Sequence, residues 1–218
     1  MKLAAPFLIA AALMLGAPPA AMAADPVEGK DYFKLDPPMP PADPAKLVVT
    51  EFFSYQCPHC YKFAQPFEAW TAKLPADVKA NRAAVAIGHE QWVPAAQAFY
   101  ALTALRKVPA IDDAFFGAIH RDRKALYTEA AVTDWAVGQG IDRTAFQNAY
   151  RSFSVQLQVK RADDASRQAR LPSVPSLLID GRYLVAIADD GDFNDQLALA
   201  DALVKRARAE RSAAKPRT

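Results

Sequence analysis

Two cysteines, Cys57 and Cys60, are the only ones in the 218-residue chain, and two residues separate them. They follow an apolar, strand-like run and stand where a helix is expected to begin. Positions i and i+3 then share one helix face, so the two sulfurs are close enough to form a disulfide bond. A bond that encloses two residues constrains the unfolded chain very little, which argues against a purely structural staple. The pair therefore predicts reversible dithiol chemistry, since strained or exposed disulfides are the labile ones.

The expected position of Cys57 at the start of a helix favours its thiolate form. The thiolate is both the attacking and the leaving species in thiol–disulfide exchange. Free N–H groups and the positive end of the helix dipole stabilise a negative charge there; Pro58 suits the first helical turn, and His59 adds a donor or a cation. A stabilised thiolate favours the reduced protein and makes the disulfide oxidising. Cys60, one turn deeper, is expected to stay a protonated thiol.

Glu51 is a carboxylate inside the strand-like run 47–53. Alternation along a strand places it on the same face as Val49 and Phe53, so either that face meets water at the end of the strand or the carboxylate is buried. Burial would raise the pKa of Glu51. A core carboxylate six residues before the first cysteine could exchange a proton with Cys60, directly or through water.

Cys57, His59 and Cys60 could in principle ligate zinc or copper. Their tight spacing suits tetrahedral ligation poorly, and no fourth ligand is evident. We therefore expect no metal, and no cofactor other than the redox-active disulfide itself. The remaining histidines, His89 and His120, are assigned no role in the chemistry.

The first 23 residues have the features of a secretory signal peptide. Lys2 gives a basic start, residues 3–15 are almost wholly apolar, and Ala21-Met22-Ala23 forms a small-residue cleavage site. The apolar stretch is shorter than the roughly 20 residues that a membrane span requires. Cleavage after about Ala23 would deliver the chain to an oxidising compartment, where a disulfide can persist.

The charge balance excludes little, but it gives no support for nucleic-acid binding. The chain has 26 basic and 24 acidic residues, and removal of the signal peptide takes away only one basic residue. A basic stretch at the C-terminus, residues 205–217, is expected to form a solvated last helical turn and a frayed tail, without a function of its own.

The hydrophobic pattern predicts an α/β chain in which a helical segment interrupts the strands. The proline-rich segment 36–44 is expected to be an extended connector, with regular structure beginning after it. Thr128 and Asp142 have the character of helix N-caps, and Gly140 that of a C-cap. The expected elements are a strand at 47–53, a helix from 58 to before Pro75, a strand at 82–88, four or five helices within 92–168, a hairpin of strands 175–179 and 182–187, and a helix at 194–209.

The chain resembles the DsbA family of bacterial periplasmic disulfide-forming oxidoreductases over nearly its whole mature length. The resemblance lies in Glu51-Phe52-Phe53-Ser54 ahead of Cys57-Pro58-His59-Cys60-Tyr61, in the helical insert, and in Val174-Pro175 at the head of the hairpin. Tyr55 and Gln56 depart from the pair of phenylalanines that is common in well-known members. The resemblance implies a thioredoxin fold, residues 24–88 and 167–210, with an inserted helical domain, residues 89–166, and a flexible tail, residues 211–218.

The same resemblance implies roles for three residues outside the cysteine motif. Glu51 would exchange protons with Cys60. The Val174-Pro175 bond would be cis, and its loop would lie against the cysteines and hold an extended substrate segment by strand-like pairing with Val174. The implied function is a monomeric periplasmic oxidase that donates its disulfide to reduced secreted proteins and is reoxidised by a membrane partner resembling DsbB.

Two other functions are compatible with parts of the sequence. In a disulfide reductase or isomerase the electrons would run the other way; such isomerases commonly carry an N-terminal dimerisation domain, for which residues 24–46 are too short. A chaperone-like peptide binder or a metal carrier would depend little on its cysteines. A double serine variant that kept full activity would identify that third class.

Overall fold

The computed structural model describes residues 25–186 and 192–214. The expected signal peptide lies outside the described residues. So do Ile187, at the end of the expected hairpin, and the last four residues of the expected tail. Within the described ranges, no helix is both long and apolar enough to cross a membrane.

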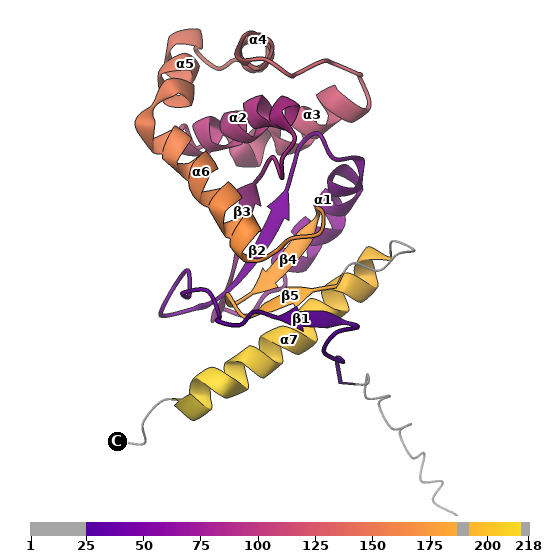
Figure 1. Ribbon diagram of the computed structural model, residues 1–218. Helices are drawn as coiled ribbons and strands as arrows, with labels where there is room; N and C mark the ends of the chain where they lie inside the picture. Colours follow the sequence, from indigo (N-terminus) through magenta and orange to yellow (C-terminus); the bar gives the residue numbers. More distant parts are fainter. Residues whose placement is uncertain (1–24, 187–191, 215–218) are drawn as a thin grey trace, which may run out of the picture.

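A five-stranded sheet in the order β1-β5-β4-β2-β3 forms the centre of the fold (Figure 1). Strand β2 pairs in parallel with β3 and antiparallel with β4, and β5 pairs antiparallel with both β4 and β1. Apolar residues on both faces of β2 are buried, as expected for a strand covered on both sides. The strands are β1 (Tyr32–Lys34), β2 (Leu47–Phe53), β3 (Val78–Ala84), β4 (Ser176–Ile179) and β5 (Tyr183–Val185).

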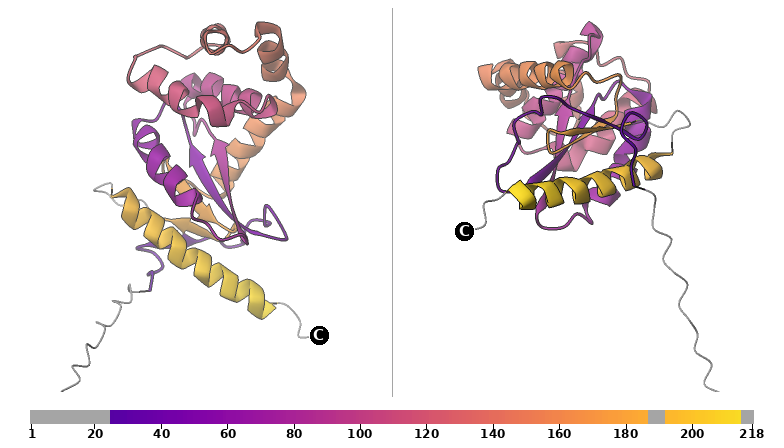
Figure 2. Two further views of the ribbon diagram at one scale, coloured as in Figure 1. Left: turned by 180° about the vertical axis from the view of Figure 1, so that it is seen from behind. Right: turned by 60° about the horizontal axis from the view of Figure 1, so that its bottom comes forward.

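Two helices, α1 (Pro58–Thr71) and α7 (Phe193–Ala214), cover one face of the sheet (Figure 2). Their apolar residues share one core cluster with those of the sheet; Phe63 and Phe67 come from α1, and Leu197 and Leu203 come from α7. The N-terminus of α1, where the cysteines stand, is directed toward the helical domain.

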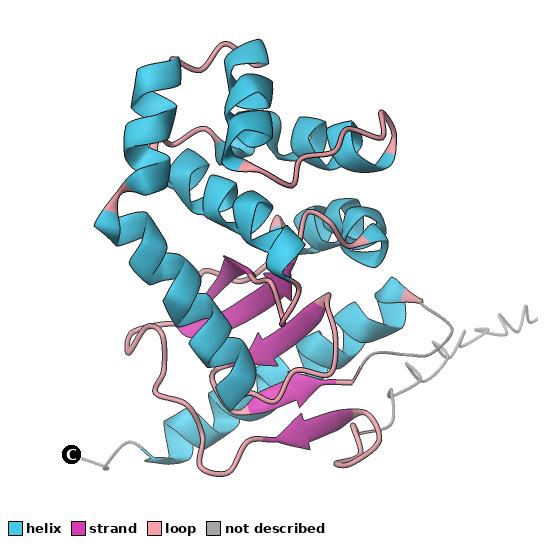
Figure 3. Cartoon of the chain, turned by 45° about the horizontal axis from the view of Figure 1, so that its top comes forward, coloured by secondary structure: helices cyan, strands magenta, loops and turns pink. Residues whose placement is uncertain are grey.

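The remaining helices form a helical domain that packs over one end of the sheet (Figure 3). Its core is continuous with Phe52 and Phe53 at the end of β2. The N-caps are as expected, because the side chains of Thr128 and Asp142 accept hydrogen bonds from backbone N–H groups at 3.2 and 2.7 Å. The helices are α2 (Val93–Ala104), α3 (Val108–His120), α4 (Glu129–Gly138), α5 (Arg143–Arg151) and α6 (Phe153–Gln168), and a short 3₁₀ turn, Glu90–Trp92, precedes them.

Several elements differ from the sequence prediction, and tertiary contacts explain the main differences. Strand β3 spans Val78–Ala84 instead of residues 82–88, since parallel pairing with β2 covers those seven residues. Strand β5 is also shorter than expected and ends at Val185. Strand β1 precedes the proline-rich segment, where no regular structure was expected, and pairing with β5 holds its three residues. Helix α7 continues to Ala214, so residues 211–214 are helical and not part of a tail.

The basic C-terminal stretch is also less solvated than expected. Arg211 pairs with the carboxylate of Asp180, whose side chain is only 1% exposed. Arg208 pairs with Asp77 at 2.7 Å. These ion pairs attach the last turns of α7 to the sheet end and explain why the helix extends past residue 209.

Candidate active site

The cysteine pair lies where β2 gives way to α1. Cys57 is the N-cap of the helix: its backbone is extended, and its sulfur accepts a hydrogen bond from the backbone N–H of Cys60 at 3.4 Å. Pro58 occupies the first turn, as the sequence predicted. Both cysteines are unbonded thiols and are buried, with 5% and 0% of their surface exposed. The helix start therefore presents its free N–H groups to the Cys57 sulfur.

The two thiols have pKa values displaced in opposite directions. The pKa of Cys57 is lowered to about 7, chiefly by the hydrogen bond from the Cys60 side chain; burial opposes this, and backbone N–H groups of Cys60 and His59 lower it further. Burial raises the pKa of Cys60 well above the ordinary thiol value, and the adjacent Cys57 raises it more. Cys57 is thus the residue that ionises, and Cys60 stays protonated.

His59 acts on Cys57 through its backbone N–H in this geometry. Its side chain is exposed, which reduces the electrostatic effect of an imidazole charge through solvent screening. Tuning by the His59 side chain therefore stays a prediction.

The loop before β4 lies against Cys57, although 117 residues separate them in the chain. The Cys57 thiol donates a hydrogen bond to the backbone carbonyl oxygen of Val174 at 3.3 Å. Val174 and Pro175 are buried, and the peptide bond between them is cis, as the resemblance implied. A role of this loop in holding substrate stays a prediction.

Glu51 is fully buried, so of the two alternatives the sequence left open, the solvated strand end is wrong. Arg82, its register partner on β3, donates from Nε to Glu51 Oε2 at 2.6 Å. Burial raises the pKa of Glu51, while the guanidinium of Arg82 lowers it in part. An ionised Glu51 would also make a smaller contribution that raises the pKa of each cysteine, after the larger effects of burial and of the neighbouring thiol.

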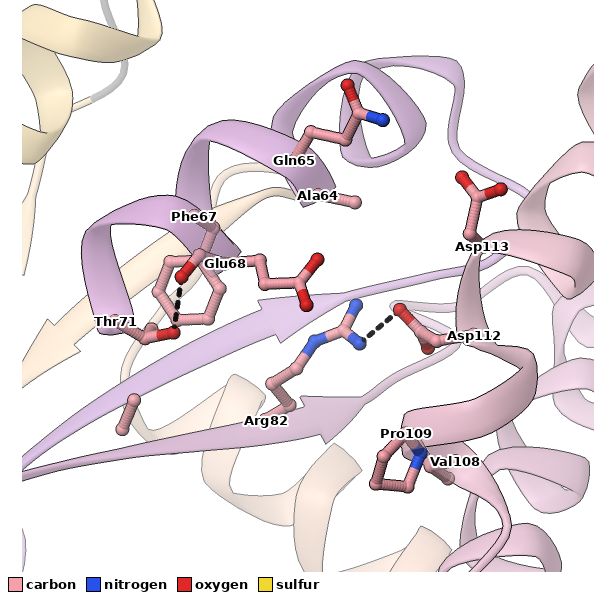
Figure 4. Close-up of a pocket in the computed structure, with 11 residues that line it drawn as sticks. Ala64, Gln65, Phe67, Glu68, Thr71, Arg82, Val108, Pro109, Asp112 and Asp113 are labelled. Atoms are coloured by element: carbon pink, nitrogen blue, oxygen red, sulfur yellow. Dashed lines mark hydrogen bonds and ion pairs between the residues drawn. The ribbon is translucent and has the colours of Figure 1, made fainter. Parts of the chain in front are cut away.

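Arg82 also bonds to a second carboxylate, Asp112 on α3, through Nη1 at 2.8 Å. The other oxygen of Asp112 accepts a hydrogen bond from the hydroxyl group of Tyr55. Arg82 and Asp112 line a pocket of about 410 Å³ between α1, β3 and α3 (Figure 4). Sequence reasoning missed both residues, because nothing in the local pattern places α3 beside β3.

Comparison with known proteins agrees with this geometry. A family model described as Thioredoxin matches residues 42–198. The thiol:disulfide interchange protein DsbA of Bordetella parapertussis is 34% identical over 202 residues, covering 92% of this chain and 96% of that protein. The protein of the same name from Pseudomonas aeruginosa is 35% identical over 190 residues, covering 87% and 90%.

The chain belongs to the DsbA family. The crystal structure of Pseudomonas aeruginosa DsbA superposes with a TM-score of 0.80 at 34% identity, covering 84% of this chain and 95% of that one. This DsbA-family protein is accordingly a thiol:disulfide oxidoreductase whose thioredoxin fold carries an inserted helical domain, as the sequence predicted.

The site of this DsbA-family protein includes a further histidine, His120, for which the sequence pattern indicated no role. The ring of His120, at the end of α3, donates from Nε2 to the backbone carbonyl of Tyr55 at 2.7 Å. It also stacks on Tyr61, with ring centroids 5.1 Å apart and planes 10° from parallel. His120 thus holds the loop that precedes Cys57 against the helical domain. The ring of His89 instead packs at a tilt against Trp92, with ring centroids 4.4 Å apart, where His89 is the N-cap residue of the 3₁₀ turn.

Gln56 makes a similar attachment in this DsbA-family protein. Its side-chain amide donates to the backbone carbonyl of Leu126 at 3.2 Å. Tyr55 and Gln56, the two departures from the common phenylalanine pair, therefore both bond to the helical domain. These polar contacts hold the cysteine loop at points where phenylalanine could only pack.

Proposed function

We propose that this protein is the periplasmic oxidase that donates its Cys57–Cys60 disulfide to reduced secreted proteins. The observation that carries the direction of transfer is the pair of opposite pKa displacements at the start of α1. A Cys57 thiolate that is stable near neutral pH is a good leaving group and favours the reduced protein. The lowered pKa makes the disulfide more oxidising than that of an ordinary thiol pair, and together with membership of the DsbA family it supports electron flow from substrate to protein.

The exchange takes place in two displacements. A substrate thiolate attacks the Cys57 sulfur of the oxidised protein, the sulfur–sulfur bond breaks, and the electron pair goes to Cys60, which takes up a proton. A second substrate thiolate then attacks the substrate sulfur of the mixed disulfide, and Cys57 leaves as a thiolate. The substrate has lost two electrons and gained a disulfide, while the protein holds one thiolate and one thiol.

Glu51 supplies the proton that Cys60 needs in the first displacement. Its burial and its electrostatic coupling to Cys60 support this role. When a membrane oxidase of the DsbB type reoxidises the protein, Cys60 must lose that proton before it can attack, and Glu51 accepts it. A carboxyl group whose pKa is raised by burial can act in both directions.

The loop at Val174 and Pro175 receives the substrate. The carbonyl of Val174 lies 3.3 Å from the Cys57 sulfur, so a peptide joined to that sulfur passes directly beside the loop. Backbone groups of Val174 then pair with the extended peptide, and this mode accepts many sequences. The protein acts as a monomer, without metal or other cofactor, after cleavage of the signal peptide near Ala23.

Equilibration against a glutathione redox buffer tests the direction of transfer. We expect the Cys57–Cys60 pair to remain largely reduced at glutathione ratios that leave an ordinary structural disulfide oxidised. A strongly reducing midpoint would instead identify a reductase or isomerase. Full substrate oxidation by a Cys57→Ser, Cys60→Ser double variant would contradict thiol chemistry altogether.

The His59→Ser variant measures the part of the tuning that comes from the imidazole. It removes a donor or cation beside Cys57 but leaves the helix start and its backbone N–H groups in place. We expect a higher Cys57 pKa and a less oxidising midpoint, with exchange activity retained. An unchanged midpoint would assign all the tuning to the backbone and to Cys60.

A further inference from the structure

The guanidinium group of Arg82 pairs with two carboxylates, that of Glu51 on β2 and that of Asp112 on α3. Arg82 donates from Nε to Glu51 at 2.6 Å and from Nη1 to Asp112 at 2.8 Å. The remaining nitrogen, Nη2, and the second oxygen of Glu51, Oε1, are buried without a hydrogen-bond partner among the described residues. The group therefore has a single positive charge for two acids in a largely buried space, so both acids cannot be ionised without cost.

The two carboxylates are not equivalent. Both oxygens of Asp112 accept hydrogen bonds, one from Arg82 and one from the hydroxyl group of Tyr55, and its side chain is 23% exposed. Glu51 has a donor on only one oxygen among the described residues, and its side chain is 0% exposed. Hydrogen bonding and solvent both favour the charge on Asp112, so a proton shared by the pair belongs on Glu51.

We propose that Asp112 is a positioning residue that keeps Glu51 protonated. Because Asp112 shares the Arg82 guanidinium, Arg82 stabilises the ionised form of Glu51 less than it would alone. The inference rests on the proton-transfer role proposed above for Glu51. A neutral Glu51 can give its proton to the Cys60 sulfur when the disulfide opens. If Arg82 paired with Glu51 alone, Glu51 would remain an ionised carboxylate and would have no proton to give to Cys60.

The hydroxyl group of Tyr55 completes this arrangement. It holds Asp112 from the side of the cysteine loop, two residues before Cys57. Phenylalanine, which is common at this position in well-known relatives, has no donor for this bond. The structure thus ties the charge state of the buried acid to a residue in which this chain departs from the common pattern.

Other charged groups near this cluster are placed differently. The two thiols lie at the start of α1, and an ionised Glu51 would raise the pKa of both. Glu68 on α1 and Asp113 on α3 line the same pocket as Arg82, and no hydrogen bond joins either of them to Arg82 in the part of the chain described. Among the pocket residues drawn in Figure 4, Asp112 is the one joined to the Arg82 guanidinium by a hydrogen bond. Asp113 is therefore a matched control: the same acid, one residue away and without the contact.

Carboxyl-carbon NMR on the ¹³C-labelled full mature protein measures the effect directly, with Glu51→Gln used to assign the Glu51 signal. We expect Asp112→Asn to lower the Glu51 pKa by about one unit, as removal of a competing charge should. Asp113→Asn should leave it within a few tenths of a unit. Asp112→Glu, which keeps the charge, should restore most of the wild-type value.

A second readout follows the rate at which a small thiol opens the Cys57–Cys60 disulfide as a function of pH. In Asp112→Asn the rate should begin to fall about one pH unit lower than in wild type, because Glu51 loses its proton earlier. Equal shifts in Asp112→Asn and Asp113→Asn, or none in Asp112→Asn, would overturn the inference.

The wild-type protein provides a test that no folding defect can obscure. The pKa of Glu51 must lie above the ordinary glutamate value, and an ordinary or lowered Glu51 pKa would overturn the inference. The glutathione midpoint separates this outcome from the proposed function. An oxidising midpoint with an unchanged Glu51 pKa in Asp112→Asn removes only the role of Asp112, whereas a reducing midpoint removes the proposed direction of transfer.

Discussion

The reduced protein is expected to gain stability over the oxidised protein as pH rises through the neutral range. The pKa of Cys57 is about 7 in the folded protein and near 8.5 in an unfolded chain. A lowered pKa contributes stability that is complete above the unfolded value and is lost as pH falls through the folded value. At pH 7 only a few tenths of a kcal/mol is therefore present, and near pH 8.5 the gain reaches about 1.5 kcal/mol.

Cys60 limits this gain at higher pH. Its pKa is raised, so its contribution has the opposite sign and sets in only above the ordinary thiol value. For a domain of this size, 1.5 kcal/mol corresponds to roughly 3 to 6 °C in melting temperature. Thermal melts of both redox forms between pH 6 and 9 should show their difference growing toward pH 8.5.

Absorbance of the Cys57 thiolate, followed as a function of pH, provides the control for the thermal melts. Cys60→Ala removes the largest cause of the lowered Cys57 pKa and should raise that pKa, whereas Cys60→Ser keeps a hydroxyl donor and should raise it less. A melting difference that does not change with pH, or a Cys57 that titrates near 8.5 in the wild type, would contradict the oxidase interpretation.

Pro175→Thr is expected to accumulate covalent complexes with substrates. Val174, whose carbonyl accepts the Cys57 hydrogen bond at 3.3 Å, directly precedes Pro175. Proline has no N–H group, and threonine introduces both an N–H and a hydroxyl group into this buried loop. New donors beside the sulfur stabilise the mixed disulfide and slow its release. We expect a several-fold increase in reductant-sensitive complexes on non-reducing gels.

Pro172→Thr is the matched control for that variant. Pro172 belongs to the same loop, three residues earlier, but its side chain is exposed. It should trap no more substrate than the wild type, and both variants should melt cooperatively. If Pro175→Thr also traps no more than wild type, Pro175 is an ordinary residue at a strand start, and substrate binds elsewhere.

Features that depend on a few neighbouring residues were predictable from the sequence. Strand β2 has the predicted bounds, Leu47–Phe53, and the helix that follows begins at Pro58. The hairpin turn at Asp180 and Gly181 has both residues at positive φ, 54° and 68°, as a tight turn of this kind requires. Apolar runs, helix caps and turn residues act on neighbouring residues, so these features can be recognised from the sequence alone.

Elements held mainly by distant partners were not predictable. Strand β1 is three residues long and exists because β5 pairs with it. The first residues of β3 have no strong strand pattern of their own, and β2 sets their register. The end of α7 depends on Arg211 reaching Asp180. Such contacts join residues far apart in sequence, and no local pattern encodes which pairs will meet.

The functional site likewise has features that the sequence predicts and features that only the fold creates. The sequence alone determined the chemistry, because Cys57 and Cys60 at a helix start are sufficient for thiolate formation and exchange. Only the tertiary structure decided how that chemistry is controlled. Burial of Glu51, its sharing of Arg82 with Asp112, and the contact of Val174 with Cys57 all depend on separate segments meeting at one place. Burial and charge pairing set the pKa values there, and both exist only in the folded protein.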